Sequence, residues 1–370
     1  MSIMQSEVMQ TVCDFDNLYK AMWKASRNVK WKDSVAGYLK NGLVNCYKLK
    51  HSLEDGTYKL DTYTQFTVYE PKKRDIVSTR IKDRVFQRSY CDNYLYPALT
   101  RSFIYDNHAC QIGRGTNTAK DRLVAHMQKA YRENGIDSSV LKCDLTNYFG
   151  STPHTECKRA VRKRCDDAWG IHEADRIIDS FNQGNDPEIG MGLGSQATQL
   201  IQLSVLDDLD HFIKEKLHIK HYVRYMDDFI LIHKSKPYLQ YCKLKIKDWL
   251  VAHGLTLSAK KTQLFPLKQG IKFLGFRFRL TQTGRVVKTM LPEKVTRERR
   301  RLRKLVALAK AGVKTKAEVD ACYQSWKAHA EYGDTHNLIL CMDRYYKNLW
   351  RDELCSITNP SSRRALRSGA

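Results

Sequence analysis

The stretch that decides the fold is His221-Tyr-Val-Arg-Tyr-Met-Asp-Asp-Phe-Ile-Leu-Ile-His233, in which two short apolar runs flank a pair of adjacent acids. Apolar runs of this length, separated by polar residues, are typical of a β-hairpin. Neighbouring side chains of a regular strand point to opposite faces, so Asp227 and Asp228 can converge only at a bend or tight turn. We therefore expect a hairpin that carries two carboxylates at its turn.

A third acid lies in a comparable setting earlier in the chain. Asp144 interrupts an apolar strand pattern in residues 139–150, Ser-Val-Leu-Lys-Cys-Asp-Leu-Thr-Asn-Tyr-Phe-Gly. A buried carboxylate without a cation is costly, and three carboxylates together repel one another unless divalent cations lie among them. Hard oxygen ligands suit Mg²⁺, and two such ions about 3.5–4 Å apart can activate a 3′-hydroxyl and stabilise a pyrophosphate leaving group.

The three acids therefore predict a polymerase-type site for two Mg²⁺ ions, for which Mn²⁺ could substitute. In the alternative interpretation, Asp144 caps a turn and the Asp227-Asp228 pair is a solvated hairpin tip. The charge of the chain argues against that alternative. Lys and Arg number 63 against 40 Asp and Glu, which gives a formal net charge of +23 over 370 residues. A surface so positive favours nucleic acid as the partner.

Composition excludes several other classes of protein. A hydrophobic content of 42% excludes a disordered chain. No apolar run approaches the roughly 18–20 residues of a membrane span, and the polar first residues lack a signal-peptide pattern. Eleven cysteines without a CxxC pair indicate reduced, packed thiols and not a disulfide framework or a zinc ribbon. We expect a cytoplasmic protein that does not bind membranes.

Local patterns predict an α+β fold. Phe15, Leu18 and Met22 recur at helical spacing after Asp14, a candidate N-cap. Residues 285–310 contain ten basic and two acidic residues around an apolar stripe, which predicts one basic amphipathic helix. The other patterns predict strands at residues 63–70 and 271–280 and helical segments at residues 81–99, 194–217, 238–253 and 316–349.

Six segments resemble, in order, the motifs of reverse transcriptases. Tyr225-Met-Asp-Asp228 resembles their Y-x-D-D box, and Asp144-Leu-Thr-Asn-Tyr-Phe149 resembles their first catalytic motif. The other four are Tyr69–Arg74, similar to the fingers segment that receives the triphosphate; Met191–Gln199, similar to the glycine-opened template and nucleotide helix; Leu257–Thr262; and Phe273–Phe276, similar to the primer grip.

This resemblance implies a right-hand polymerase fold with fingers, a ferredoxin-like palm sheet and a helical thumb. The expected domains are N-terminal helices and fingers at 1–135, a palm at 136–283 with a fingers insertion near 153–190, a thumb at 284–355 and a basic tail at 356–370. The implied activity is RNA-directed DNA polymerisation from a DNA or RNA primer, with dNTPs as substrates. The pattern of an RNase H domain is missing from the sequence.

The resemblance also implies roles for individual residues. Asp144, Asp227 and Asp228 would bind the metal ions, and Lys261 would protonate the leaving pyrophosphate, although Lys260 beside it is an alternative. Lys72 and Arg74 would clamp the triphosphate, unless they form only a solvated basic loop. Phe149 would exclude a 2′-hydroxyl, unless it is an ordinary core residue. Leu193, Gly194 and Gln199 would touch the templating base or the nucleotide. Template and primer would contact Phe273, Leu274 and Gly275 and, along their backbones, Arg297, Arg300, Arg301, Arg303 and Lys304.

A narrower resemblance concerns the segment around Gly194. Leu193 stands where most reverse transcriptases have Gln, and Thr198-Gln199 where they have Ser-Pro. This pattern resembles the enzymes of bacterial and phage diversity-generating retroelements, although Gly192 departs from their usual Pro. Such enzymes copy a structured template RNA into mutagenised cDNA together with a small basic accessory protein. The alternatives are an anti-phage defence or retron-type reverse transcriptase and, from another class, a catalytically inactive RNA-binding protein.

Overall fold

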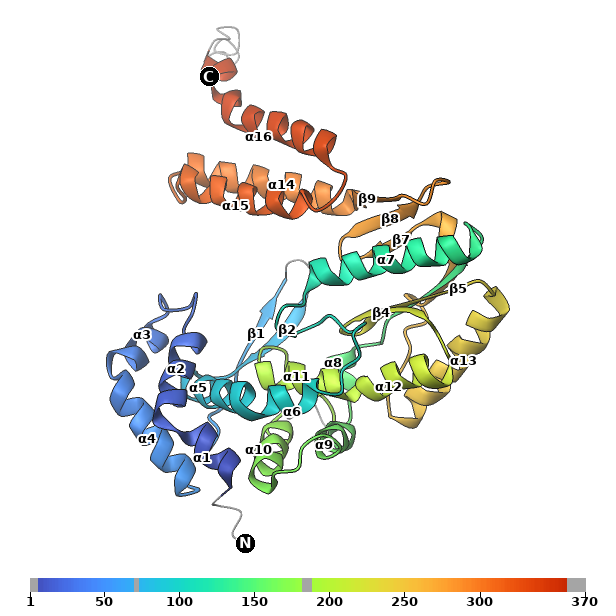
Figure 1. Cartoon of the computed structure of the whole chain (residues 1–370). Coiled ribbons are helices and arrows are strands. Elements are labelled where there is room, and N and C mark those ends of the chain that lie inside the picture. The colour runs from blue at the N-terminus through green and yellow to red at the C-terminus, as the bar shows by residue number, and fades with distance from the viewer. Residues whose placement is uncertain (1–5, 70–72, 182–187, 358–370) are drawn as a thin grey trace, which may run out of the picture. The chain divides into compact units, whose positions relative to one another are not determined.

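The computed structural model describes residues 6–69, 73–181 and 188–357, with side chains described as far as residue 351. The chain forms two compact units (Figure 1). Unit 1 contains Met1–Leu123 and Ser139–Leu264, and unit 2 contains Val124–Ser138 and Phe265–Ala370. The domain boundaries expected from the sequence stay a prediction.

Unit 1 begins with a group of helices that surround an apolar core. They are α1 (Glu7–Cys13), α2 (Phe15–Ala25), α3 (Asp33–Lys40) and α4 (Gly42–Glu54). The Asp14 carboxylate accepts a hydrogen bond from the Asn17 backbone N–H at 3.0 Å, which confirms the predicted N-cap of α2. Leu18, Ala21 and Met22 form the buried face of α2, which packs against α4 and α5 (Ile81–Tyr90).

A two-stranded hairpin and a segmented helix follow. Strands β1 (Thr64–Val68) and β2 (Arg74–Ser78) pair antiparallel, which confirms the predicted strand near residue 65. The predicted helix at residues 81–99 is present, but it contains a π-helical turn, η2 (Cys91–Leu95), between α5 and α6 (Tyr96–Thr100). Pro97, the second residue of α6, has no backbone N–H to donate to the π-helical turn before it.

The centre of unit 1 is a four-stranded sheet with the order β4-β5-β3-β6. Its strands are β3 (Ser139–Cys143), β4 (His221–Tyr225), β5 (Asp228–His233) and β6 (Gln263–Pro266). Helices separate β3 from β4, and α13 (Lys236–Ala252) separates β5 from β6. This βαββαβ connectivity, with the first strand beside the third, is ferredoxin-like. It confirms the predicted palm sheet.

The helices between β3 and β4 cover one long segment of the chain. They are α8 (Tyr148–Ser151), α9 (His154–Arg162), α10 (Ala168–Asp179), α11 (Gln196–Val205), α12 (Asp207–His211) and the π-helical η3 (Phe212–Lys216). The helical stretch predicted at residues 194–217 is confirmed from residue 196 to residue 216, but it is divided at Leu206 and ends in a π-helical turn. Ten of the eleven cysteines lie in the described part of the chain with described side chains, and all ten are free thiols.

Unit 2 combines a small antiparallel sheet with long helices. The sheet has the order β7-β8-β9, formed by β7 (Ile271–Phe273), β8 (Phe276–Leu280) and β9 (Val286–Met290), and a short 3₁₀ turn, η4 (Leu267–Gln269), precedes it. The helices are α14 (Pro292–Lys310), α15 (Lys316–Ala330) and α16 (His336–Ile357). A further helix, α7 (Thr116–Asn134), belongs to both units, and its Tyr131 hydroxyl donates a hydrogen bond to the Gln282 carbonyl.

Two expectations for unit 2 are wrong. Residues 271–280 are not one strand, because Leu274 and Gly275 adopt φ angles of 45° and 89° and turn the chain back on itself. The basic helix does not begin at Arg285, because β-branched residues 286–287 open strand β9. The helix starts at Pro292, whose fixed φ suits the first helical position.

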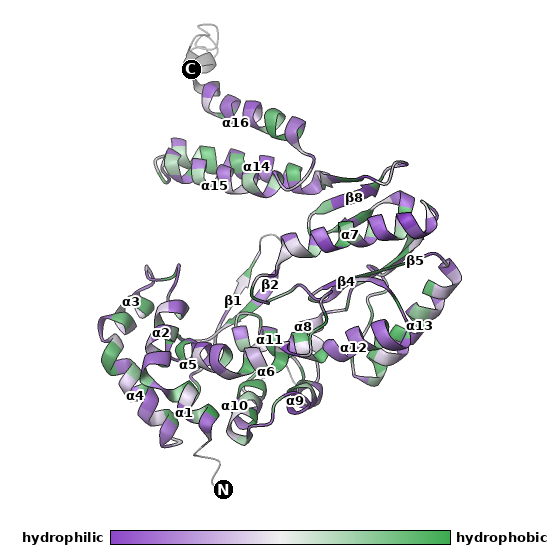
Figure 2. Cartoon of the chain, viewed as in Figure 1, coloured by the Kyte–Doolittle hydropathy of each residue, from purple (hydrophilic) through white to green (hydrophobic). Residues whose placement is uncertain are grey.

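The long helices of unit 2 have a core of their own. Leu302 and Val306 of α14 pack against Val319 and Tyr323 of α15, and Met342 of α16 completes the cluster. Figure 2 shows both hydrophilic and hydrophobic residues along α14, as expected for an amphipathic helix. In the ranges that the structure describes, no helix is long and apolar enough to cross a membrane.

Candidate active site

The paired acids lie on a tight turn between β4 and β5. Tyr225 pairs with Asp228 across the two strands, so Met226 and Asp227 alone form the connection. Met226 has a φ of 57°, a left-handed conformation that residues with a side chain rarely adopt. The predicted hairpin is confirmed, with Asp227 at its tip and Asp228 as the first residue of β5.

A buried arginine holds this turn from behind. The guanidinium of Arg224 is fully buried and forms an ion pair with Asp210, with an Nη2–Oδ2 distance of 2.5 Å. Its Nη1 atom donates a hydrogen bond to the Met226 carbonyl at 3.1 Å. Arg224 therefore links the buried end of α12 to the strained residue of the turn. A charged residue inside the apolar run was a signal in the sequence, and our sequence reasoning missed it.

Asp144 reaches the same place from β3. Cys143, the last residue of β3, pairs with Phe229 of β5. Asp144, the residue after β3, therefore lies close to the Asp227-Asp228 turn. Burial raises the pKa of Asp227, and the negative charge of Asp144 raises it further, whereas Lys261 and Arg74 lower it. Burial also raises the pKa of Asp228 to about 6. The charge of Asp144 also raises the pKa of Asp228, so the three predicted acids lie close enough to act on one another.

Two lysines contact these acids. Lys142 of β3 lies 2.9 Å from Asp228 (Nζ to Oδ2), and Lys261 lies 2.5 Å from Asp144 (Nζ to Oδ1). The other oxygen of Asp228, Oδ1, is buried and has no hydrogen-bond partner. Within the residues that the structure describes, no group of three or more His, Cys, Asp or Glu side chains is arranged to hold a metal ion. The two-ion site stays a prediction, and Lys142 is a residue that sequence reasoning missed.

Of the predicted triphosphate clamp, the structure describes one member. Arg74 is exposed at the start of β2 and is near enough to Asp227 to lower the pKa of that carboxyl. Lys72 lies outside the described residues. Phe149 is half-buried against the edge of Tyr148, and its carbonyl accepts a hydrogen bond from the Met191 N–H at 2.6 Å.

The glycine-opened segment lies close to β2. The Leu193 carbonyl accepts a hydrogen bond from the Val77 N–H at 3.1 Å. Gly194 has a φ of 135°, and a Cβ atom at this position would lie 2.7 Å from the Val77 carbonyl oxygen. This close approach requires glycine.

One helical turn further along α11, Gln199 is close to the Asp227-Asp228 turn. Its Oε1 atom accepts a hydrogen bond from the Cys110 thiol at 3.3 Å, and the Cys110 sulfur lies 3.9 Å from the sulfur of Met226. Gln199 and the Y-x-D-D box are therefore joined through Cys110. No pattern in the sequence distinguishes this cysteine from the other thiols.

Comparison with known protein families shows to which family the chain belongs. The family model described as reverse transcriptase (RNA-dependent DNA polymerase) matches residues 71–278 of the 370. The chain belongs to the reverse transcriptase family. This membership confirms the right-hand polymerase fold of the α+β class that the ferredoxin-like sheet already indicates.

Solved structures of reverse transcriptase relatives are also similar. The apo telomerase of Candida tropicalis aligns at 14% identity and a TM-score of 0.47, covering 62% of this chain and 49% of that chain. The same telomerase truncated from its C-terminal domain aligns at 13% identity and a TM-score of 0.48, covering 67% and 60%. The telomerase of Candida albicans, in complex with a TWJ fragment of telomeric RNA, aligns at 12% identity and a TM-score of 0.48, covering 73% and 55%.

This reverse transcriptase chain spans about half the length of the solved telomerases that it matches. A search of curated proteins gives no match.

The residues of this family member that are predicted to grip the primer and to follow the template and primer backbones lie in unit 2. Phe273 is buried, and Leu274-Gly275 forms the turn of the β7–β8 hairpin. A Cβ atom on Gly275 would lie 3.7 Å from Lys294 of α14 and 3.9 Å from His329 of α15. The hairpin turn and the start of α14 are thus neighbours. All five predicted backbone contacts on α14 are exposed, namely Arg297, Arg300, Arg301, Arg303 and Lys304.

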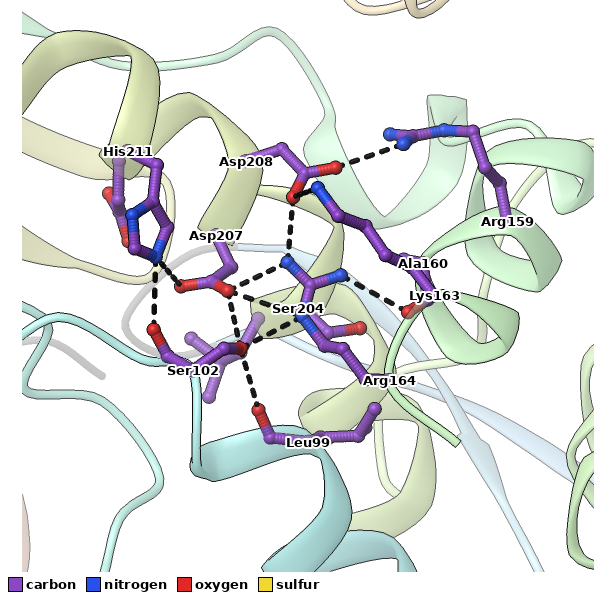
Figure 3. A network of polar contacts seen from close by, with 12 residues as sticks. Leu99, Ser102, Arg159, Ala160, Lys163, Arg164, Ser204, Asp207, Asp208 and His211 are labelled. Carbon is purple, nitrogen blue, oxygen red and sulfur yellow. Dashed lines mark hydrogen bonds and ion pairs between the residues drawn. The ribbon is translucent and has the colours of Figure 1, made fainter. Parts of the chain in front are cut away.

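A second pair of adjacent aspartates lies in unit 1, on α12 (Figure 3). Arg164 contacts both members, at 2.7 Å from Asp207 Oδ2 and 2.7 Å from Asp208 Oδ1. Arg159 and Lys163 add contacts to Asp208 at 2.9 Å and 2.8 Å. Although burial opposes it, hydrogen bonds from Lys163 and Arg159 hold the pKa of Asp208 well below its usual range. This pair fastens α12 to α9 and takes no part in the candidate active site.

Proposed function

We propose that this chain catalyses RNA-directed DNA synthesis, adding deoxynucleotides to the 3′-end of a DNA or RNA primer on an RNA template. One observation carries the proposal. Asp144 leaves β3 beside the Asp227-Asp228 turn, within a sheet and a sequence range that match the reverse transcriptase family. Intact acids at all three positions argue against a catalytically inactive RNA-binding relative.

Asp144, Asp227 and Asp228 would hold two Mg²⁺ ions. The donor set fits such ions, because all three ligands are carboxylates and Mg²⁺ prefers oxygen. Burial raises the pKa values of Asp227 and Asp228 although Lys142 contacts Asp228, and the Oδ1 atom of Asp228 is buried without a hydrogen-bond partner, so a further cation would stabilise the charged acids. When bound, the ions would activate the primer hydroxyl and stabilise the pyrophosphate leaving group.

Other residues would orient the substrates. Arg74, together with Lys72, would bind the triphosphate, because a guanidinium offers paired donors and stays charged. Lys261, whose ammonium lies beside Asp144, would donate a proton to the departing pyrophosphate. The half-buried ring of Phe149 would occupy the space of a 2′-hydroxyl, so the product would be DNA.

The biological setting that we propose is a diversity-generating retroelement, with a structured template RNA and a small basic accessory protein as partners. Leu193 and Gln199 support this assignment. The Gln199 N–H donates to the Ser195 carbonyl at 3.4 Å, a bond that the usual proline could not form. The Thr198 hydroxyl donates to the Gly192 carbonyl at 2.9 Å, a local contact that a serine could also make. Defence and retron-type enzymes share the chemistry and remain the alternatives.

Primer extension tests the proposal. Wild type, Asp227→Ala and the matched surface control Asp55→Asn are incubated with Mg²⁺, dNTPs and either poly-rA/oligo-dT or a mixed-sequence RNA, and the products are sequenced. We expect synthesis by wild type and the control and none by Asp227→Ala. Errors concentrated opposite template adenine would support the diversification setting. If wild type stays inactive even with its native flanking RNA, the catalytic proposal fails and the RNA-binding alternative replaces it.

A further inference from the structure

Helix α13 of unit 1 has a second apolar stripe on the side that faces away from the sheet. The helix contacts strands β3 and β5, and its buried residues are Leu239, Cys242, Ile246 and Leu250. On the opposite side, Tyr241, Leu244 and Val251 are 47%, 61% and 61% exposed. Figure 2 shows hydrophobic residues among the hydrophilic ones along α13. Large apolar side chains that share one exposed helix face indicate a place where another molecule binds.

The exposed stripe has the spacing of a coiled-coil seam. Its positions are separated by four, three, four and three residues, and they are Pro237, Tyr241, Leu244, Asp248 and Val251. This alternation gives a repeat of seven residues, in which the first and fourth positions contact a partner helix. All five residues are exposed. The stripe therefore favours one α-helix as the partner, lying along α13 for about two repeats.

Lysines flank this stripe on both sides. Lys245 follows Leu244 and Lys247 precedes Asp248, and at these two positions coiled coils select their partners by charge. Both lysines are exposed, and the Lys245 ammonium lies 5.7 Å from the centre of the Tyr241 ring. Within the described residues, no ion pair involves either lysine. A partner helix with acids at its own flanking positions would pair with both lysines.

One acid interrupts the apolar seam. Asp248 occupies an inner position of the repeat, where a polar residue costs stability but fixes the register and the choice of partner. In the part of the chain that the structure describes, Asp248 forms no ion pair. A partner helix that places one lysine or arginine opposite Asp248 would therefore be held in a single register. The partner is acidic at its flanks and has one cation within its apolar stripe.

We propose that the outer face of α13 binds an acidic amphipathic α-helix of a partner protein. A second copy of this chain does not fit, because symmetric pairing of two α13 helices places Lys245 beside another Lys245 or beside Lys247. Residues 358–370 do not fit either, because they contain three arginines and no acid. RNA would pair with the lysines, but Leu244 and Val251 offer it neither a charge nor an aromatic face.

A synthetic helix and the full chain test this assignment by fluorescence anisotropy. The labelled peptide has three heptads with leucine in the seam, one lysine at the central seam position and glutamate at the flanks. A second peptide has lysine at the flanks, and we expect only the first peptide to bind. Leu244→Gln should weaken this binding about tenfold, because one buried leucine contact is lost. Leu43→Gln, which changes a leucine of α4 that is 60% exposed, is the matched control and should bind like wild type.

Reversal of the flanking charges separates a specific seam from general attraction to a basic protein. In the double variant Lys245→Glu/Lys247→Glu, the preference should invert, so that the peptide with lysine flanks binds and the peptide with glutamate flanks does not. The proposal is overturned if the first peptide does not bind wild type. It is also overturned if Leu244→Gln leaves binding unchanged or if the double variant keeps the original preference.

Two further measurements test the other occupants. In sedimentation velocity, wild type and Leu244→Gln should have the same mass, and a dimer that only the variant loses would assign the face to a second copy. A single-stranded oligo-uridylate should not displace the bound peptide. Displacement, with RNA affinity lowered in the double variant, would assign the face to RNA, and either result would overturn the proposal. None of these assays needs DNA synthesis, so a failed primer-extension assay would not imitate their failure.

Discussion

Two of the three pairs of adjacent aspartates in unit 1 have opposite surroundings. Asp207-Asp208 on α12 is neutralised by Arg164, with further cations on Asp208, and the pKa of Asp208 is held below its usual range. Asp227-Asp228 has one lysine on Asp228, and the pKa values of both acids are raised. The same dipeptide is thus a structural fastening in one place and an unsatisfied anionic site in the other.

The largest expected effect is on catalysis. Asp227→Asn keeps the shape of the turn but removes charge where metal ligands are proposed. Loss of several kcal/mol of transition-state stabilisation would lower the synthesis rate on the order of 10³-fold. Single-nucleotide extension under saturating dNTP measures it. Asp208→Asn is the matched control and should retain its activity per folded molecule. Equal losses in both variants would abolish the distinction between the two pairs.

The second expected effect is on stability. Arg164→Met leaves Asp207 buried without its main counter-ion, and breaking a buried ion pair costs about 3–5 kcal/mol. Urea unfolding followed by circular dichroism measures this loss. A change below about 1 kcal/mol would show that the remaining cations suffice and that the α12 pair is not a fastening.

The third expected effect is a gain in stability and not a loss. Asp228 has a raised pKa, so its charged form destabilises the folded state, and wild type loses stability as the pH rises from about 4, the ordinary Asp pKa, to about 6. At pH 7 in EDTA, Asp228→Asn should therefore increase the free energy of unfolding, on the order of 2 kcal/mol, and below about pH 4 the difference should vanish. Urea unfolding at pH 3.5, 5 and 7 measures it, and a destabilised variant at pH 7 would contradict it.

The smallest expected effect is on the pH dependence of stability at Asp208, which should be opposite to that at Asp228. The pKa of Asp208 is lowered, so its contribution to stability is present at neutral pH and is lost as the pH falls below about 4. Asp208→Asn should cost about 1.5 kcal/mol at pH 7, the value of a charged hydrogen bond. The gap between wild type and variant should shrink in acid, the reverse of the profile for Asp228→Asn. A pH-independent gap would assign the effect to packing and not to charge.

The sequence predicts the β4–β5 hairpin because its determinants are local. Two apolar runs and a polar pair at the turn need no distant partner to be recognised, and the Asp14 cap of α2 is local in the same way. Asp144 is predicted to lie near the hairpin because of the order and spacing of the family motifs. No local pattern in the sequence indicates this tertiary contact. The ferredoxin-like sheet follows from these segments and from the helix before β6.

The rest depends on contacts that spacing does not encode. The charged groups around Asp207-Asp208 and Asp227-Asp228 could not be predicted, because the cations that contact these acids come from other elements, such as Arg164 near α9 and Lys142 in β3. The β7–β8 turn was missed because Leu274 adopts a left-handed conformation that a leucine rarely takes. The start of α14 was misplaced because a run of basic residues continues across the boundary between β9 and the helix.

The two-residue connection at Met226-Asp227 limits how this site can evolve. With Tyr225 paired directly to Asp228, the hairpin has no spare residue in its loop. A one-residue insertion or deletion would shift the register of β5 and turn Asp228 and the buried run after it to the opposite faces of the sheet. Substitution of Met226 changes one side chain, whereas a change of loop length relocates every side chain of a strand. The residue at the second position of the Y-x-D-D box should therefore vary, whereas the length of the box should not. The cause is the pairing of the backbone and not the chemistry of the site.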